Sequence, residues 1–305
     1  SSTPAVRILS LPNALNLNTD YESPILSLTP TTKILHLIRH AEGTHNISPD
    51  HKTPAHLDAT LTPRGVDQCR QLSRYAKNLE VDAVLVSPMT RCLETARLSF
   101  PHLYGEQDDD RGDCNREDKN ATNNYDSYPS LGENNNQHKS GSTNYGDNHF
   151  DRNNNTNELK IPFIAHEEWR ETVNYLCDSR RPLTALRSLY PCVDFSPCIH
   201  DHDPLWEKYQ QIHGCHETHT KLRESNDPQG LLERAHKAWK VVLERPERRL
   251  ALVGHSAFFM HMFTPLFEEL EGVVRYEDEE VEELMRGKGR FENCELRSVL
   301  VDFPL

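Results

Sequence analysis

The stretch Ile34-Leu35-His36-Leu37-Ile38-Arg39-His40 decides the fold of this chain. Its first five residues form a compact, mostly apolar run, bounded by Thr31-Thr32 before it and by Gly43 after it. Such a run is typical of a strand that is buried on both faces, as in a parallel sheet. Arg39 and His40 follow directly, so we expect chemically active side chains at the carboxyl end of a buried strand.

The same order of strand, loop and helix recurs along the chain. Ala83–Val86 and Arg249–Gly254 are further apolar runs, and amphipathic or apolar helices are predicted after them over 89–99 and 257–270. Thr62-Pro63 predicts a helix start, because threonine caps a helix and proline fits its first turn. A last strand is expected over 295–302. This order indicates an α/β fold, whose ligands lie at the carboxyl ends of the strands.

Two segments differ in composition from the rest. Residues 1–31 contain four prolines and little periodicity, which favours an N-terminal arm on the surface. Residues 105–159 contain 13 asparagines against two leucines, with no isoleucine or valine. Such a stretch buries too little apolar area to offset the entropy of ordering, so it is predicted to be a disordered insertion. One folded domain is then expected over 32–305, interrupted at 105–159.

The net charge of -13, from 34 basic and 47 acidic side chains, disfavours nucleic acid or an anionic membrane as a partner. No apolar run approaches the roughly 18 residues that span a bilayer. Eight cysteines without a C-x-x-C pair suggest free thiols in a reducing compartment. We therefore expect an intracellular, cytoplasmic protein. The first residue, Ser1, is not methionine, which leaves an organelle open.

Three separate segments carry the candidate site. Arg39-His40 ends the first strand, Arg91 opens the helix after the second, and Gly254-His255-Ser256 ends the third. Two histidines and two arginines at one sheet edge would form a pocket of positive charge in an acidic protein. The sequence therefore predicts a phosphate site at this edge.

Five segments in order resemble the histidine phosphatase superfamily, specifically its phosphoglycerate mutase-like branch of plants and fungi. They are Leu35-His36-Leu37-Ile38-Arg39-His40-Ala41-Glu42-Gly43-Thr44-His45-Asn46, Asp58-Ala59-Thr60-Leu61-Thr62-Pro63-Arg64-Gly65, Ser87-Pro88-Met89-Thr90-Arg91-Cys92-Leu93-Glu94-Thr95-Ala96, Cys177-Asp178-Ser179-Arg180-Arg181 and Phe291-Glu292-Asn293-Cys294-Glu295-Leu296-Arg297-Ser298. The resemblance implies a three-layer α/β/α sandwich with a mostly parallel central sheet.

The resemblance also implies roles for the site residues. His40 is expected to attack phosphorus and form a phosphohistidine, which suits a neutral imidazole near neutral pH. Arg39, Asn46, Arg91 and His255 are expected to bind the phosphoryl oxygens, and His255 to assist as charge spreads over them. The family places a carboxylic acid in mid-chain, and Glu171 fits that position best, with Glu168 as the alternative.

Further candidates are less specific. Arg180 and Arg181 either bind a second anionic group of the substrate or are surface charge, and Ser256 is a nearby hydroxyl that could contact phosphate. The histidines between His200 and His219 have no fixed spacing, so a solvated flap is favoured over a metal site. No metal and no organic cofactor are expected.

The favoured function is hydrolysis of a small phosphorylated metabolite through phosphohistidine. One alternative is a phosphoglycerate-type mutase, which passes the phosphoryl group to a second hydroxyl instead of water. The other is a non-catalytic phosphate-binding module that keeps the fold. The oligomeric state is left open.

Overall fold

The computed structural model describes residues 6–9, 32–50, 53–104, 161–263, 274–276, 279–283, 285 and 290–302. The chain divides into two units, one of residues 1–106 with 160–305 and one of residues 107–159. The predicted insertion at 105–159 lies outside the described residues, so its predicted disorder stays a prediction.

The described residues form an eight-stranded sheet in the order β5-β4-β3-β6-β2-β8-β1-β7. The first five of these are parallel to their neighbours, and β8 is antiparallel to both β2 and β1. The bounds are β1 Val6–Leu9, β2 Thr32–Arg39, β3 Ala83–Val86, β4 Phe163–Ala165, β5 Val193–Asp194, β6 Arg249–Gly254, β7 Val274–Tyr276 and β8 Leu296–Asp302. The prediction of a mostly parallel sheet is confirmed.

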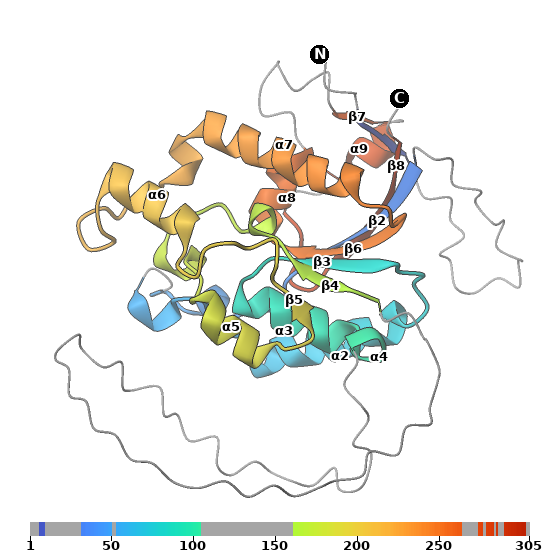
Figure 1. Cartoon of the computed structure of the whole chain (residues 1–305), viewed down its shortest axis with the longest axis horizontal. Coiled ribbons are helices and arrows are strands. Elements are labelled where there is room, and N and C mark those ends of the chain that lie inside the picture. The colour runs from blue at the N-terminus through green and yellow to red at the C-terminus, as the bar shows by residue number, and fades with distance from the viewer. Residues whose placement is uncertain are drawn as a thin grey trace, which may run out of the picture. The chain divides into compact units, whose positions relative to one another are not determined.

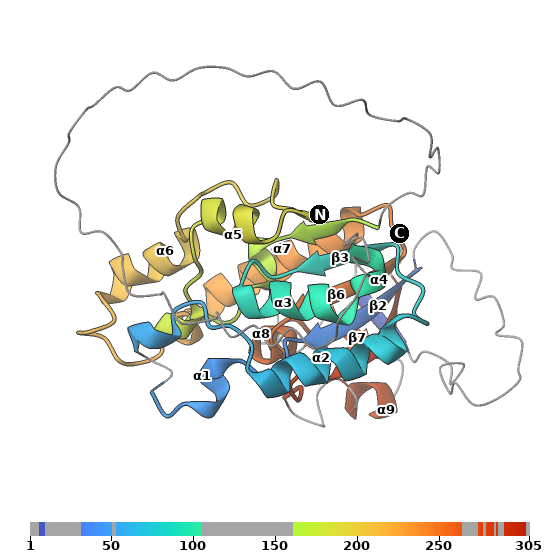
Figure 2. The same ribbon diagram turned by 90° about the horizontal axis from the view of Figure 1, so that it is seen from below.

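Helices cover both faces of this sheet, as Figures 1 and 2 show, so the three-layer α/β/α sandwich is confirmed. One face carries α2 Pro63–Ala76, α3 Thr90–Ser99, α4 Pro101–Tyr104 and α5 Leu183–Leu189, and the other carries α7 Pro228–Glu244 and α8 Ser256–Phe263. The remaining helices are α1 Thr44–Ile47, α6 Pro204–His213 and α9 Glu279–Glu282, with 3-10 turns at Pro54–His56, Glu167–Trp169, Leu176–Asp178 and Glu224–Asn226.

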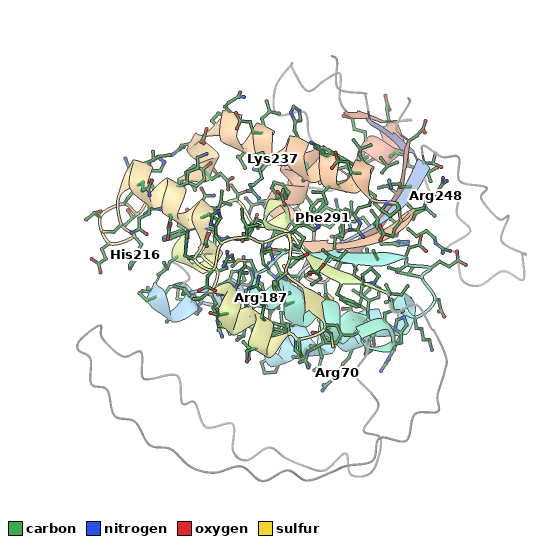
Figure 3. All side chains as sticks on the ribbon, viewed as in Figure 1. Arg70, Arg187, His216, Lys237, Arg248 and Phe291 are labelled. Atoms are coloured by element: carbon green, nitrogen blue, oxygen red, sulfur yellow. The ribbon has the colours of Figure 1, made fainter. Side chains whose placement is uncertain are left out.

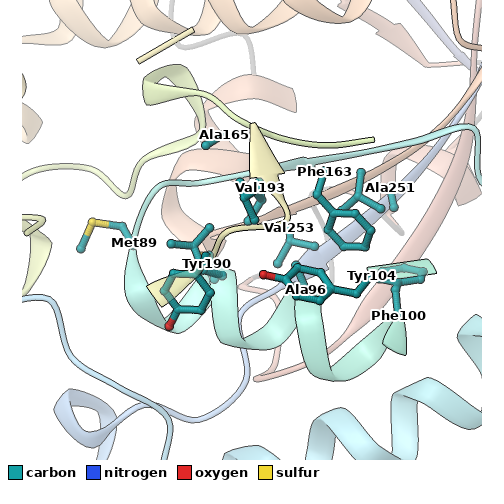
Figure 4. Close-up of a cluster of buried hydrophobic side chains, with 14 of the residues drawn as sticks. Met89, Ala96, Phe100, Tyr104, Phe163, Ala165, Tyr190, Val193, Ala251 and Val253 are labelled. Carbon is teal, nitrogen blue, oxygen red and sulfur yellow. The ribbon is translucent and has the colours of Figure 1, made fainter. Parts of the chain in front are cut away.

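Alternation along the central strands divides the core into two clusters. Leu250 and Leu252 of β6 pack on the side of α7 and α8, with Trp239 and Phe258. Ala251 and Val253 point to the opposite face, where they join α3 residues (Figure 4). Successive side chains of a strand point to opposite faces, so a strand that is apolar at every position is buried on both.

Local sequence signals explain the ends of several helices. The hydroxyl of Thr62 accepts the backbone N–H of Gly65 at 3.0 Å, and Pro63 occupies the first position of α2, as predicted. The side chain of Asp227 caps α7 in the same way through Gly230, at 3.0 Å. The described part of the helix predicted over 257–270 is α8, and residues 264–270 lie outside the described residues.

The predicted N-terminal arm needs a correction at Val6–Leu9. These residues form β1, which pairs with β8 and β7 within the sheet. Both partner strands come from the last third of the chain, so a four-residue run without local periodicity could not reveal its place. Backbone pairing with strands from distant parts of the sequence stabilises β1, although its own sequence pattern does not indicate a strand.

Candidate active site

Two parallel strands bring the predicted histidines together. β2 and β6 pair in register, with Arg39 opposite Gly254, and the backbone N–H of His40 donates to the Gly254 carbonyl at 2.9 Å. The next residue, His255, therefore lies beside His40. The two ring centroids are 5.1 Å apart with the ring planes at 60°. Both side chains are buried, with 2% and 0% exposed.

Hydrogen bonding determines the tautomer of His40. Its Nδ1 lies 2.7 Å from the carbonyl oxygen of Ala41, which can only accept, so a neutral ring carries its proton on Nδ1. The lone pair is then on Nε2. Burial, followed by the charges of Arg91, His45 and Arg39, holds the pKa of His40 well below its ordinary value. His40 is therefore neutral at physiological pH, as a nucleophile requires.

Arg91 enters the site from the first turn of α3 and is almost fully buried, with 1% exposed. Its Nη1 donates to the Cys177 carbonyl at 2.8 Å, and its Nη2 lies 3.4 Å from Nδ1 of His255. Asp58 anchors this helix start, because its carboxylate accepts the N–H and the hydroxyl of Thr90 at 2.8 and 2.7 Å. The guanidinium is thus fixed against the second histidine.

His255 is held in one orientation by Ser87, which follows β3, and by residues of α3. Its Nε2 lies 3.0 Å from the hydroxyl of Ser87 and 3.3 Å from the thiol of Cys92, while Arg91 donates to its other nitrogen. Burial comes first among the causes that hold the pKa of His255 well below its ordinary value, and the charge of Arg91 comes next. Burial also raises the pKa of the Cys92 thiol to about 12, so Cys92 does not compete as a nucleophile.

Buried donors of Arg91 and of the residues next to His40 and His255 in the sequence have no hydrogen-bond partner among the described residues. They are Nε of Arg39, Nε of Arg91 and the hydroxyl of Ser256. The Arg39 Nη1 donates to the carbonyl of Phe291 at 2.6 Å, in the segment that Figure 3 labels near the centre of the molecule. Buried polar groups are nearly always satisfied, so these donors are groups that could bind an anion.

Asn46 lies on the short helix α1, which follows the His40 loop. Its side-chain oxygen accepts the N–H of Gly43 at 2.9 Å, which fixes the amide so that Nδ2 donates to Nε2 of His45 at 3.2 Å. A Cβ atom at Gly43 would lie 2.8 Å from the His45 ring, so only glycine lets the ring lie there. The His45 ring lies 5.4 Å from the His40 ring. His45 thus adds a third imidazole beside His40 and His255, one that our sequence analysis did not single out.

The carboxylate of Glu171 is anchored by two backbone groups. Its Oε1 accepts the N–H of Thr172 at 2.8 Å and that of Phe258, in the first turn of α8, at 3.2 Å. Burial raises the pKa of Glu171, the charge of Asp178 raises it further, and the charges of Arg91 and Arg39 oppose this. A carboxyl group whose pKa is raised in this way is better suited to act as a general acid.

Glu168, the alternative acid, lies in a different environment. It lines a cavity of about 250 Å³ together with Lys208 and Lys237, and its carboxylate is 3.6 Å from Nδ1 of His166. Burial alone would raise the pKa of Glu168, but the hydrogen bond and charge of His166 lower it overall. A carboxylate with a lowered pKa is a poor proton donor.

Two buried ion pairs hold the backbone on either side of Glu171. Arg234 donates to both oxygens of Glu224 at 2.8 Å and to the carbonyl of Arg170 at 2.7 Å. The same Glu224 accepts the N–H of Val173 at 2.7 Å. Arg170 itself pairs with both oxygens of Asp203, at 2.8 and 2.9 Å. No local pattern distinguishes these supporting residues from surface charge, so the sequence analysis missed them.

The two arginines after the acid differ in what they contact. Arg180 is 3% exposed and donates to Glu167 and to the carbonyls of Arg181, Asp201, His200 and His202. Its guanidinium stabilises this loop, so we do not retain Arg180 among the substrate residues. Arg181 is 20% exposed at its side chain and lies 3.5 Å from the carboxylate of Asp58, which also anchors α3.

The residues considered for metal binding do not converge. Among the residues that the structure describes, no group of three or more His, Cys, Asp or Glu side chains could hold a metal ion. The rings of His213 and His219 stack at 4.8 Å, and the seven described cysteines are free thiols.

No helix within the described ranges is long and apolar enough to cross a membrane.

The chain is similar to several known proteins. Residues 35–108 match the model of the histidine phosphatase superfamily (branch 1). A phosphoglycerate mutase-like protein of Arabidopsis thaliana is 31% identical over 279 residues, covering 88% of this chain and 84% of the relative. Phosphoglycerate mutase-like protein 1 of the same plant is 27% identical, covering 88% and 81%. The alpha-ribazole phosphatase of Shigella flexneri aligns with a TM-score of 0.40 at 14% identity, covering 87% of this chain and 89% of that one.

The chain therefore belongs to the histidine phosphatase superfamily, among its phosphoglycerate mutase-like members.

Proposed function

We propose that this protein is a phosphatase that hydrolyses a small phosphomonoester through a phosphohistidine at His40. The observation that carries the proposal is the state of that residue. His40 is buried and neutral, its Nδ1 donates to Ala41, and its Nε2 keeps a lone pair beside His255. Attack by Nε2 on phosphorus forms the N–P bond as the bond from phosphorus to the ester oxygen breaks.

Positive charge around His40 would stabilise the phosphoryl group during transfer. Arg39 and Arg91 each have an Nε–H without a partner among the described residues, and Arg91 also contacts His255. Fixed donors in a buried site stabilise charge that develops on the non-bridging oxygens. Asn46 and Ser256 would supply neutral donors at the edge. These groups provide the charge that a metal supplies elsewhere, so we propose metal-independent chemistry.

Glu171 would complete both half-reactions. Protonated, it donates its proton to the leaving alkoxide, and as a carboxylate it then takes a proton from the water that attacks phosphohistidine. The products are an alcohol, inorganic phosphate and free His40. The anchoring of Glu171 by backbone N–H groups of Thr172 and Phe258 supports this role.

A mutase is the second candidate, because the curated relatives are named phosphoglycerate mutase-like. A mutase must bind a second anionic group of a bisphosphorylated intermediate. The buried arginines on either side of Glu171 in the sequence, Arg170 and Arg180, donate to protein groups instead. This favours transfer to water over transfer to a second hydroxyl.

The test is release of inorganic phosphate from a panel of small phosphomonoesters, with and without a bisphosphoglycerate. We expect release that the bisphosphorylated compound does not stimulate. Stimulated isomerisation without net release would identify a mutase. Binding of inorganic phosphate without turnover of any ester, a reactive aryl phosphate included, would identify a non-catalytic module.

A further inference from the structure

The two histidines of the site carry their protons on opposite ring nitrogens. His40 donates from Nδ1 to the Ala41 carbonyl, which leaves the lone pair on Nε2. For His255 the partner of Nδ1 is Nη2 of Arg91, at 3.4 Å. A guanidinium has only donors, so Nδ1 of a neutral His255 accepts and the ring proton is on Nε2.

The Nε2 side of His255 is closed by protein groups. Nε2 lies 3.0 Å from the hydroxyl of Ser87 and 3.3 Å from the thiol of Cys92, and both of these residues are fully buried. The thiol also donates to the carbonyl of Gly254 at 3.6 Å. The backbone N–H of Ser87 donates to the carbonyl of Val253 at 3.0 Å, which fixes Ser87 against the end of β6.

Nδ1 is therefore the nitrogen of His255 that can meet a ligand, because it lies against the guanidinium proposed to bind the phosphoryl oxygens. In the free protein this nitrogen is an acceptor. The oxygens of a phosphoryl dianion are acceptors as well, so they cannot form a hydrogen bond with an unprotonated Nδ1. His255 can bind the phosphoryl group only after Nδ1 has gained a proton from solvent.

We propose that Ser87 is a positioning residue of this active site, which holds Nε2 of His255 while Nδ1 changes from an acceptor of Arg91 to a donor to the phosphoryl group. The inference rests on the proposed function, because it needs a phosphoryl group beside His255. A hydroxyl suits this role, since it accepts from an Nε2 that keeps its proton and donates to an Nε2 that has lost it. A carbonyl or an amide N–H could serve only one of these states.

The charged and titratable groups around His255 favour a neutral ring in the free protein. Burial, then the charge of Arg91 and the further charges of His40, Arg170 and His45, all lower the pKa of His255. A bound phosphoryl dianion is opposite in sign to these groups and makes a proton on Nδ1 more favourable. The proton should therefore arrive with the anion and not before it.

Tungstate tests the change in protonation, because it is a tetrahedral dianion like phosphate but is not an ester. The measurement is NMR of isotope-labelled histidine nitrogens, whose shifts differ between protonated and unprotonated states. The signals of His255 are identified by their loss in His255→Gln. In the free protein Nδ1 should be unprotonated and Nε2 protonated, and with tungstate bound Nδ1 should be protonated. A protonated Nδ1 in the free protein, or an unprotonated one in the complex, would overturn the inference.

Ser87→Ala tests the positioning role. Without the hydroxyl, Nε2 of His255 keeps only the thiol of Cys92, a weak partner, so the two ring tautomers should mix in the free variant. Tungstate should bind about 2- to 12-fold more weakly, the net contribution of a typical hydrogen bond. Wild-type His255 signals together with unchanged tungstate binding would show that Ser87 has no such role.

Ser99→Ala is the matched control. Ser99 is equally buried on α3, but it takes no part in the hydrogen bonds that the described residues make to the rings of His40 and His255. The control should leave the His255 signals and tungstate binding unchanged. If it weakens binding as much as Ser87→Ala does, the loss reflects a general loosening of the core and the inference is wrong.

Cys92→Ala addresses the other group beside Nε2. If this variant mixes the tautomers of His255 while Ser87→Ala does not, the thiol is the partner and the inference is wrong. Failure of the proposed function is recognised separately, because none of these measurements needs turnover. A protein that hydrolyses no phosphomonoester but protonates Nδ1 on binding tungstate would contradict the phosphatase and support the role of Ser87. Hydrolysis without that change would do the reverse.

Discussion

The carboxylate of Glu171 accepts the backbone N–H of Phe258 at 3.2 Å, which ties the acid to the first turn of α8. That turn begins directly after His255, and the N–H of Phe259 donates back to the His255 carbonyl at 2.9 Å. Glu171, the proposed proton donor, and His255 are therefore both held by the start of α8. Backbone hydrogen bonds hold the Glu171 carboxylate in one position, which suits the proton transfer that we propose for it.

Replacement of His40 by alanine should lower phosphate release by several orders of magnitude, because no other described nucleophile lies where it could form the covalent bond to phosphorus. Rapid acid-free quenching after mixing with substrate should trap an acid-labile phosphate on His40 of the wild-type protein. Appreciable turnover by the alanine variant, with an unchanged melting temperature, would contradict the mechanism.

The acidic limb of the pH profile should lie well below pH 6.5, because the pKa values of His40 and His255 are both held well below the ordinary histidine value. A lowered pKa means that the neutral, nucleophilic form persists as the pH falls. The measurement is kcat/KM from pH 4 to 8, corrected for ionisation of the substrate phosphate. A limb at or above pH 6.5 in the corrected profile would show that His40 is not the group held neutral.

Ser256→Ala tests whether the hydroxyl of Ser256 contacts phosphate or is an unsatisfied hydroxyl of the core. The hydroxyl is buried at the start of α8 and has no partner among the described residues. If it donates to the phosphoryl group, its loss should weaken inhibition by inorganic phosphate about 10- to 150-fold, in line with about 1.5–3 kcal/mol for a hydrogen bond to a charged group. If it does not, the variant should bind phosphate as before and be slightly more stable.

The parts of the site that could be predicted from the sequence lie at strand ends. The apolar runs of β2, β3 and β6 are visible as strands, and parallel pairing then dictates that residues after them meet at one edge. His40 and His255 are adjacent for this reason. The resemblance to a known family singled out Glu171, and the backbone bond to Phe258 now gives its position a physical reason.

The supporting residues could not be predicted, because their roles depend on contacts between distant segments. In the sequence Arg234 and Glu224 are ordinary charged residues. Only the fold buries them as an ion pair that holds the backbone on either side of Glu171. For Arg180 the sequence left substrate binding and surface charge open, whereas the buried guanidinium donates to carbonyl groups of its own loop. Likewise β1 became recognisable only through its partners β7 and β8.

Removal of residues 108–157 should leave the thermal stability nearly unchanged. The composition of this stretch offers almost no apolar side chains to a core, and loop length affects closure entropy only logarithmically. The described residues that flank it are close together, because the rings of Tyr104 and Phe163 meet at 5.0 Å. A short glycine–serine linker should therefore join the ends. A large fall in melting temperature would show that the stretch packs against the domain, and changed activity at constant stability would indicate a role at the active site.

The identity of the proton donor can be tested by comparing leaving groups. Glu171→Gln keeps the shape and removes the proton, so it should slow an alkyl phosphate by about 10²- to 10⁴-fold, the usual contribution of a general acid. An aryl phosphate should be slowed much less, because a phenolate departs without full protonation. The informative quantity is the ratio of the two losses, since a folding defect would lower both rates alike.

Glu168→Gln is the matched control for this comparison, because Glu168 is three residues away, is partly buried and pairs with His166 rather than with the site. The lowered pKa of Glu168 makes it a poor proton donor. Glu168→Gln should therefore hydrolyse both substrates at similar fractions of the wild-type rate. A loss that depends on the leaving group in Glu168→Gln, together with none in Glu171→Gln, would move the acid to Glu168. In that case the hydrogen bond between Glu171 and Phe258 would only cap α8 and would have no role in the mechanism.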